Sequence, residues 1–467
     1  MDAPIAAPGL RQGFHLEADR GLINDPNGLC HFGGRFHVFV QWNRFAKDHS
    51  YKEWGHFTSA DLVEWDFEGS ALLPDQDYDR DGVYSGSACE AGGLLHLYYT
   101  GNRREGSART SAQCLAVSRD GRTFVKRGPV LRTSPGFTSH FRDPKVWRDG
   151  EAFRMVIGAQ TVDGDGVVAG YRSEDGVTWT GPALLGRSSR AQMIECPDLF
   201  RSGDETVLVY GLQYRDGRTD AVLGARAVHR VLPSPPRWSE EPIDLDLDAI
   251  DVDAGFDFYA PQTFSAPDGR RLMIAWMSRL DAEQELVLAR AAPRLHCLTL
   301  PREVDVRSGR LRQRPARELR GLLGEEIVLG ARPAGAVEPG RRRAGIRLPG
   351  RTFHVEIRRP DGPLRIELND GEILVDYHSS SGVLTMRRRN WAMGGLDERA
   401  CRIGGLERLE LWADVSSLEL FANDGEAAMS ARIMPGSSSG SVLVDCDDAG
   451  ADLVVRTIRT TTQNPNS

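Results

Sequence analysis

The sequence lacks several features that would place the protein in a common class. Its seven cysteines are scattered and no two form a CxxC pair, so we expect reduced thiols rather than a disulfide framework or a zinc site. It has no apolar run of about 18 residues, which a membrane-spanning helix would need. The formal net charge of −8 argues against nucleic acid or an anionic membrane as a partner.

The first 15 residues show no basic segment followed by an apolar one, so we expect no secretory signal peptide and a cytoplasmic location. Glycine, by contrast, is abundant, at 50 of 467 residues. Frequent tight turns and a β-rich fold would account for this content. A chain of this length predicts about two or three domains.

One pattern recurs five times in the first 300 residues: a short apolar strand, a turn, and a second strand rich in β-formers. The turns begin at Gly33, Gly92, Asp149, Gly203 and Asp268, at intervals of 59, 57, 54 and 65 residues. Each interval has room for about four strands, which predicts an all-β fold with a five-bladed β-propeller. A stacked array of sandwiches is the alternative, but each unit is too short for an independent sandwich.

The repeat stops near residue 300, which sets the predicted domain boundaries. We expect the propeller in residues 1–305 and a linker in residues 306–326. Alternating apolar and polar residues then predict a C-terminal β-sandwich in residues 327–467. We expect this second domain to be structural, with a homodimer contact as an open possibility.

The segments before the five hairpins differ in their chemistry. They read NDPNG (24–28), YSGSA (84–88), FRDPKV (141–146), IECPDLF (194–200) and FYAPQTF (258–264). The first strand of each propeller blade lines the central channel, so Asp25, Asp143 and Glu195 should converge at one mouth. Such carboxylates could bind a hard cation such as calcium or cleave a glycosidic bond. The lack of an EF-hand loop or a tight Asp cluster favours hydrolysis.

Other side chains near these segments suit a sugar ligand or a structural role. Aromatic rings can stack on the C–H faces of a sugar, and the candidates are Trp42, Trp54, Tyr84, Tyr259 and Trp276. His49 and Lys52 could meet a phosphate or only water. The three Ser-x-Asp-x-x-x-aromatic segments, at 59–65, 118–124 and 173–179, predict hairpin turns with little chemistry.

Nine blocks between residues 13 and 304 stand in the order found in one known family. They are NDPNG, FVQWN, WGHFTS, YSGSA, FRDPKV, ECPDLF, DFYAPQTF, AWMSR and CLTLPRE. On these blocks the chain resembles glycoside hydrolase family 32, which includes invertases, levanases, inulinases and sucrose-6-phosphate hydrolases. The segment 418–435 resembles the closing motif of that family's sandwich, so the resemblance covers nearly the whole chain.

The resemblance implies a retaining β-fructofuranosidase that cleaves sucrose or sucrose 6-phosphate by double displacement. Asp25 would be the nucleophile, Glu195 the general acid and base, and Asp143 the transition-state stabiliser. The implied fructose-binding residues are Asn24, Gln41, Trp54, Tyr84, Ser85, Arg142 and Trp276. A small sugar would be the partner, and we expect no cofactor, no metal, no nucleic acid and no membrane.

Retention requires the two catalytic carboxyls about 5–5.5 Å apart, and Glu195 must hold a proton, so we expect Asp25 and an apolar wall to raise its pKa. Two departures from the family pattern are Tyr84 in place of Phe and QWNRF in place of Gln-Tyr-Asn-Pro. Alternative functions are a fructan-active exo-hydrolase such as a levanase or inulinase, or a fructosyltransferase. More remote are an inverting arabinan- or xylan-active propeller and an inactive sugar-binding propeller.

Overall fold

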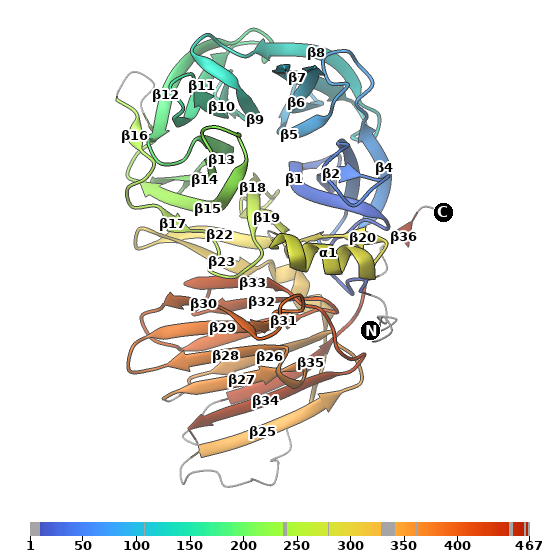
Figure 1. The fold of residues 1–467 in the computed structure, drawn as a ribbon, viewed down its shortest axis with the longest axis vertical. Coiled ribbons are helices and arrows are strands. Elements are labelled where there is room, and N and C mark those ends of the chain that lie inside the picture. The colour runs from blue at the N-terminus through green and yellow to red at the C-terminus, as the bar shows by residue number, and fades with distance from the viewer. Residues whose placement is uncertain are drawn as a thin grey trace.

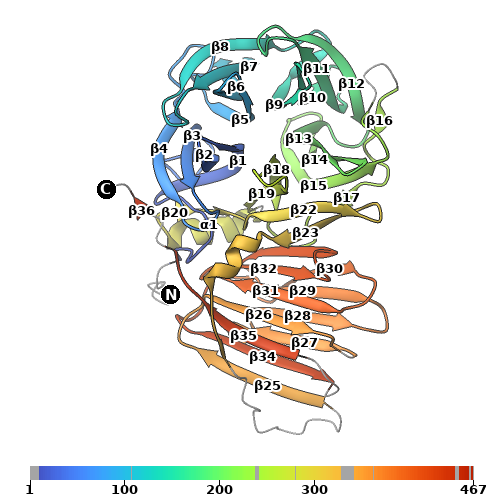
Figure 2. The ribbon, with the colours of Figure 1, turned by 180° about the vertical axis from the view of Figure 1, so that it is seen from behind.

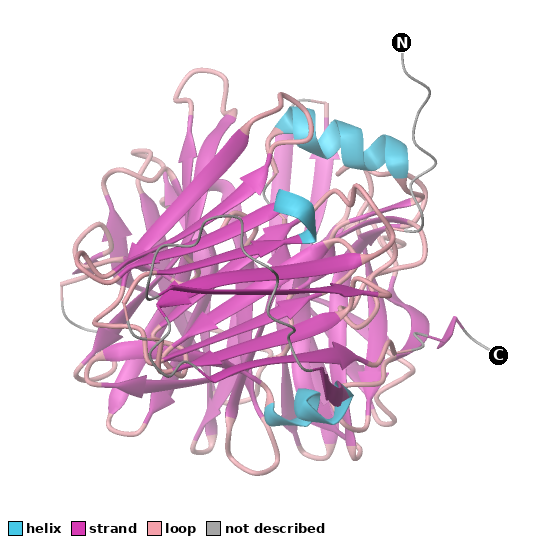
Figure 3. Ribbon diagram, turned by 90° about the horizontal axis from the view of Figure 1, so that it is seen from below, coloured by secondary structure: helices cyan, strands magenta, loops and turns pink. Residues whose placement is uncertain are grey.

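The structure is a computed structural model of the chain. It describes residues 10–106, 108–236, 241–278, 280–327, 341–360, 362–447, 452–461 and 464–465. Figure 1 shows a ring of sheets packed against a second, layered β domain. Strands dominate the molecule in the view from below, and the few helices are short (Figure 3).

Five antiparallel sheets form the ring and follow one another along the chain. Blade 1 contains β1 (Gly21–Phe32), β2 (Arg35–Asn43), β3 (Glu53–Ser59) and β4 (Asp66–Leu72). Blade 2 contains β5 (Val83–Ala91), β6 (Leu94–Glu105), β7 (Ala108–Ser118) and β8 (Val125–Arg132). Blade 3 contains β9 (Phe137–Asp149), β10 (Ala152–Thr161), β11 (Gly166–Ser173) and β12 (Thr180–Ser188), with β16 (Ile243–Asp244) at its edge.

Blade 4 contains β13 (Met193–Ser202), β14 (Glu205–Arg215), β15 (Val222–Leu232) and β17 (Ile250–Asp251). Blade 5 contains β18 (Tyr259–Ser265), β19 (Arg271–Met277), β22 (Arg302–Arg307) and β23 (Arg310–Pro315), and β21 (Cys297–Leu298) also pairs with β19. The short strand β20 (Arg294–Leu295) pairs in parallel with β1. Between β19 and β20 lies the helix α1 (Ala282–Ala291), which Asp281 caps through Gln284 N.

The ring closes because the first strands of neighbouring blades pack on each other. β1 contacts β5, β5 contacts β9, β9 contacts β13, and β13 contacts β18. The ring is completed by the contact of β18 with β1. Apolar clusters fill the spaces between blades; one joins Tyr98 of blade 2 to Met155 and Tyr171 of blade 3. The predicted five-bladed propeller is confirmed, and the stacked array of sandwiches is wrong.

The linker predicted over residues 306–326 is wrong in its first half. Residues up to Pro315 belong to blade 5, where β22 pairs with β19 and β23 pairs with β22. The run of arginines there suggests an exposed connector, but Leu311 points inward and is buried. The connection is reduced to a 3₁₀ helix, Arg317–Leu322, which is the short yellow-orange coil between the two domains in Figure 2.

The second domain is a sandwich of two six-stranded antiparallel sheets. One sheet orders β24 (Leu323–Ile327), β35 (Asp452–Ile458), β26 (Phe353–Arg358), β31 (Arg408–Ala413), β32 (Ser417–Ala422) and β33 (Ala427–Arg432). The other orders β25 (Arg341–Leu348), β34 (Gly440–Asp447), β27 (Leu364–Leu368), β28 (Ile373–His378), β29 (Val383–Arg389) and β30 (Leu396–Arg402). A 3₁₀ turn (Asn369–Gly371) follows β27, and β36 (Asn464–Pro465) returns to pair with β4.

The facing surfaces of the two sheets carry one apolar core, with Phe353, Ile366, Val375 and Leu411 fully buried. This confirms the predicted C-terminal sandwich. In the described part of the chain, no helix has the length and apolar character needed to cross a membrane.

Candidate active site

Each blade interrupts its first β-ladder at the same place, and these interruptions build the site. Pairing between the first and second strands shifts after Ile23 in blade 1 and after Tyr84 in blade 2. It shifts between Arg142 and Lys145 in blade 3, after Glu195 in blade 4 and after Tyr259 in blade 5. Such bulges bend a strand and change the direction of its side chains. All five therefore break the ladder where it lines the channel.

Proline explains most of these interruptions. It has no N–H to donate to a ladder, so it is placed at bulges or edges of sheets. In blades 3, 4 and 5 the residue before the proline has positive φ: +65° at Asp143, +44° at Cys196 and +47° at Ala260. This left-handed conformation is costly for residues other than glycine. The fold maintains it at three matching positions beside the candidate carboxylates.

The bulges bring the three predicted carboxylates together. Cys196, which follows Glu195, donates its backbone N–H to Asp143 Oδ2 at 3.1 Å. Its Sγ lies 3.9 Å from Asp25 Oδ2. One buried residue of blade 4 thus contacts the carboxylates of blades 1 and 3. Burial raises the pKa of the Cys196 thiol, and the three nearby carboxylates raise it further, so this sulfur is not a nucleophile.

A ring of hydrogen bonds orients Asp25. Asn24 donates from Nδ2 to Asp25 Oδ1 at 3.1 Å and to Gln41 Oε1 at 2.8 Å. Gln41 donates to Ser85 Oγ at 2.6 Å, and Ser85 donates to Asp25 Oδ2 at 2.6 Å. The structure therefore groups three predicted pocket residues around Asp25 as donors.

Lys52 begins this chain of donors. Its side chain is buried, at 4% exposure; Nζ donates to Asn24 Oδ1 and lies 2.8 Å from His49 Nδ1. Burial lowers the pKa of Lys52 to about 7, although the charge of Asp25 opposes the change. Lys52 thus contacts two protein side chains, and a phosphate or water as its further partner stays a prediction.

Glu195 is held by three donors on the other side of the site. Arg142 Nη2 lies 2.8 Å from Oε1, while Gln213 Nε2 and the Tyr259 hydroxyl lie 2.8 and 2.6 Å from Oε2. Arg142 is itself buried and contacts His140 Nδ1 at 2.9 Å. These contacts fix the carboxyl group of Glu195 at the mouth of the channel.

Asp143 has a shifted pKa. Burial raises it to about 7; Arg142, whose Nε lies 3.8 Å from Oδ2, opposes the rise, and the charges of Glu195 and Asp25 add to it. Asp143 therefore titrates near neutral pH. Such shifts are typical of functional carboxylates.

The predicted aromatic residues occupy different depths. Trp54 is fully buried, and its indole N–H donates to the Tyr84 carbonyl at 3.1 Å. It therefore supports the pocket from behind. Tyr84 is partly exposed. Trp276 is 6% exposed and its ring lies 6.1 Å from His49 and 6.4 Å from Tyr259.

The sequence pattern did not assign Gln213 to the site, indicated Tyr259 only as a ring that could stack on a sugar, and left Lys52 between a phosphate and water. Tyr259 has a signal, since it precedes Ala-Pro in blade 5 as Glu195 precedes Cys-Pro in blade 4. Gln213 lies near the end of β14 as Gln41 lies near the end of β2. Comparing equivalent strand positions across blades would have found both.

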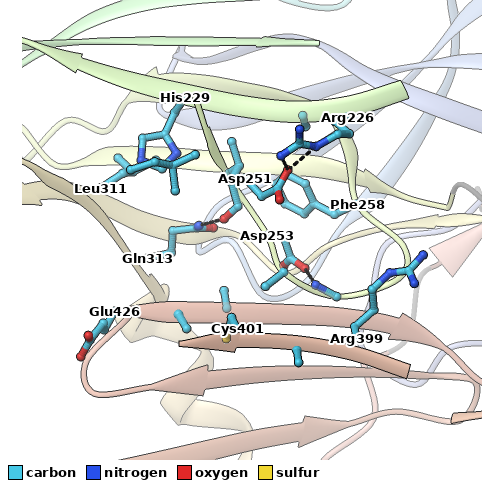
Figure 4. Close-up of a pocket in the computed structure, with 18 of the residues that line it drawn as sticks. Arg226, His229, Asp251, Asp253, Phe258, Leu311, Gln313, Arg399, Cys401 and Glu426 are labelled. Atoms are coloured by element: carbon cyan, nitrogen blue, oxygen red, sulfur yellow. Dashed lines mark hydrogen bonds and ion pairs between the residues drawn. The ribbon is translucent and has the colours of Figure 1, made fainter. Parts of the chain in front are cut away.

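A separate cleft of about 570 Å³ lies between the propeller and the sandwich (Figure 4). Its lining includes Arg226 and His229 from β15, Asp251 from β17, Gln313 from β23 and Arg399 from β30. None of the three carboxylates lines this cleft. The described residues also contain no group of three or more His, Cys, Asp or Glu side chains arranged to hold a metal ion.

Comparisons with known proteins agree with this architecture. The model of the glycosyl hydrolases family 32 N-terminal domain matches residues 15–315, and that of the family 32 C-terminal domain matches residues 352–458. The chain is 39% identical over 438 residues to a sucrose-6-phosphate hydrolase of Klebsiella pneumoniae, covering 91% of this chain and 88% of that protein.

Two solved structures show the same fold. The sucrose-6-phosphate hydrolase from Lactobacillus gasseri superposes with a TM-score of 0.81 at 26% identity, covering 96% of this chain and 93% of that one. A mutant family 32 β-fructofuranosidase from Bombyx mori in complex with sucrose gives a TM-score of 0.80 at 26% identity, covering 96% and 94%.

Proposed function

The chain belongs to glycoside hydrolase family 32 and is a glycoside hydrolase of β-fructosides, and we propose that it releases fructose from sucrose 6-phosphate or sucrose by double displacement. Relatives named sucrose-6-phosphate hydrolase and a relative complexed with sucrose support this substrate class. The observation that carries the proposal is the convergence of Asp25, Asp143 and Glu195 through Cys196.

Asp25 is proposed as the nucleophile that attacks the anomeric carbon of the fructosyl unit. Its two oxygens accept from Asn24 and Ser85, which fixes the carboxylate in one rotamer. A pre-oriented nucleophile lowers the barrier because little freedom remains to be lost at the transition state. The covalent fructosyl-enzyme formed would then be hydrolysed by water.

Glu195 is proposed as the acid that protonates the leaving oxygen and then as the base that activates water. The Tyr259 hydroxyl can accept from the protonated acid and donate to the carboxylate, because a hydroxyl does both. Once the proton has left, Arg142 and Gln213 donate to the new carboxylate. These contacts suit a group that changes protonation state twice in each cycle.

Asp143 is proposed to stabilise the positive charge of the oxocarbenium-like transition state. It is buried beside the other two carboxylates, where water screens charges weakly. It acts as an anion, so the fraction of active free enzyme should rise with pH through its pKa of about 7 and level off above it.

The test is the full-length Asp25→Asn and Glu195→Gln variants, which keep side-chain shape. We expect each to lower kcat on sucrose at least about 1,000-fold with an unchanged Tm. NMR of the wild-type reaction should show β-fructofuranose as the first product. Turnover near the wild-type rate in either variant, or release of the inverted anomer, would refute the proposed mechanism.

We also propose a cytoplasmic enzyme. All seven cysteines are free thiols, a state that a reducing compartment maintains. The homodimer stays a prediction, which sedimentation velocity of the purified chain will check.

A further inference from the structure

We propose that Arg109 is the specificity residue that binds a phosphate group on the leaving sugar. Arg109 lies in β7, close to the start of the strand, and its guanidinium carbon is 5.2 Å from the centre of the Tyr84 ring. Its Nε donates to Asn102 Oδ1. The group is thereby held flat against a residue of the candidate site.

Arg109 has no ion-pair partner among the described residues. Its Nη2 is buried and has no hydrogen-bond partner there. Arg142, by contrast, is paired with Glu195 at 2.8 Å. Burial and the neighbouring charge of Arg142 together lower the pKa of Arg109 to about 10. The charge of Asp143 partly offsets this repulsion, but Asp143 makes no ion pair with Arg109. An anionic ligand would therefore compensate the half-buried cation further.

The position of Arg109 relative to the site indicates which part of the substrate would supply that anion. This step rests on the proposed function, in which Glu195 gives its proton to the leaving oxygen. The leaving sugar therefore lies beside Glu195 and Arg142. Arg109 is close enough to Arg142 for their charges to interact. Arg215, which contacts Gln213 on the same side, is already paired with Asp220 at 2.6 Å.

A phosphate monoester fits this position better than a neutral sugar. It carries a charge of about −1.5 to −2 and three acceptor oxygens, whereas hydroxyls supply only dipoles. The guanidinium fork matches such oxygens in pairs. The other basic pair suggested by the sequence is occupied inside the protein, because Lys52 contacts His49 and Asn24.

The experiment compares kcat/KM for sucrose 6-phosphate and for sucrose in the wild type and in Arg109→Gln. We expect the wild type to prefer the phosphorylated sugar. In Arg109→Gln, kcat/KM for sucrose 6-phosphate should fall about 30-fold or more, while that for sucrose stays within about threefold. Inorganic phosphate should raise KM for sucrose in the wild type only.

A matched control is Arg122→Gln, which removes an exposed arginine of the same blade that contacts Glu68 at 3.1 Å. Its ratio of the two kcat/KM values should equal that of the wild type. Should Arg109→Gln fail to fold, Arg109→Lys keeps the charge but loses the fork, and we expect an intermediate ratio.

The outcomes separate the two levels of the argument. If the wild type releases fructose from neither substrate, the proposed function fails. If it cleaves both without preferring the phosphate, or if Arg109→Gln lowers both kcat/KM values equally, this inference is overturned. If Arg109→Gln lowers both kcat/KM values equally, Arg109 acts only by holding Tyr84.

Discussion

At the scale of single residues, the unusual feature is an ammonium group placed behind the nucleophile. Lys52 donates a hydrogen bond to Asn24, and Asn24 in turn donates to Asp25 and Gln41. The side-chain amide of an asparagine can adopt two orientations in which its oxygen and nitrogen exchange places. A donor that contacts Oδ1 fixes the orientation of Asn24. Lys52 is therefore a positioning residue that costs folding free energy, because a buried charge is poorly solvated.

Replacing Lys52 by methionine should expose this cost through its dependence on pH. The folded pKa is about 7 against 10.5 for the free group, so the unfolded chain binds more protons between those values. Wild-type stability therefore rises with pH across that window, and the full penalty is present below pH 7. Lys52→Met lacks this titration. The Tm of the variant minus that of the wild type should fall from pH 6 to pH 9.

The same variant should lower kcat on sucrose about 10-fold, because Asn24 loses the donor that orients it. Thermal melts at pH 6, 7.5 and 9 together with kcat at each pH check both statements. A Tm difference that does not change with pH, or unaltered turnover, would contradict the positioning role.

The site residues that could be predicted from the sequence lie in local motifs, whereas those that could not depend on how the blades pack together. Asp25, Asp143 and Glu195 stand in local motifs whose turn chemistry itself creates the bulge, so their convergence follows from the repeat. Trp54 stands in an equally clear block and Lys52 lies two residues before it, yet the burial of both depends on what other blades place over them. Burial is a property of the assembled ring and no local pattern contains it.

At the scale of elements, the Ser-x-Asp segments form the predicted hairpin turns, and their small part in the chemistry stays a prediction. Asp175 Oδ1 accepts the backbone N–H groups of Val177 and Thr178 at 2.8 and 2.7 Å, and Ser173 Oγ accepts that of Gly176. Asp120 makes the equivalent contacts one blade earlier. These side chains close the turn between two strands and lie at the outer edge of the blade.

Asp175→Ala should therefore lower stability and leave catalysis intact. Loss of the carboxylate that accepts two backbone N–H groups should lower Tm by about 2 °C, with kcat on sucrose unchanged. The donors Thr178 and Val177 hold the Asp175 pKa below its usual value, so the contribution is present above pH 4 and is lost in stronger acid. Differential scanning calorimetry at pH 7 checks the Tm change; Glu174→Ala, one residue away, is the control. A fall in kcat would show that this turn does affect the site.

The boundary of the fifth blade shows what element patterns miss. A four-stranded blade here is assembled from β18 and β19 and then, after helix α1, from β22 and β23. The interruption breaks the spacing on which the repeat was recognised. The arginine-rich segment after helix α1 is recognised as strand only because β19 pairs with β22, the first strand of that segment.

At the scale of the whole molecule, ionic groups join the propeller to the sandwich. Arg302 of β22 is fully buried, with Nη2 at 2.6 Å from Glu419 and Nη1 at 3.0 Å from Asp253. His15 lies 2.7 Å from Asp414 and 3.0 Å from Glu419. Glu419 and Asp414 belong to the sandwich sequence, whereas Arg302, His15 and Asp253 belong to the propeller sequence. Separating the domains would therefore break the ion pairs that Arg302 and His15 make with the sandwich.

This junction should make the stability of the whole chain depend on pH through His15. Burial alone would lower the His15 pKa, but the hydrogen bonds that His15 donates to Asp414 and Glu419, together with the charges of these two acids, outweigh it and raise the pKa to about 9. A raised pKa means that the stabilisation is complete below pH 6.5 and is lost as pH rises through 9. His15→Gln removes it, so at pH 6 the variant should be less stable than the wild type by about 3 kcal/mol.

The difference in unfolding free energy between the wild type and His15→Gln should decrease as pH is raised towards 9.5. The wild type loses the charge of its imidazolium over this range, whereas the glutamine does not titrate. Urea unfolding at pH 6, 8 and 9.5 measures both free energies. In the variant, Asp414 still accepts hydrogen bonds from the backbone N–H groups of Gly13 and Phe14. The segment before β1 therefore stays in place, and the comparison reports the effect of the His15 charge. If the gap is the same at all three pH values, His15 is not charged in the folded protein, and the junction is held by packing and neutral hydrogen bonds.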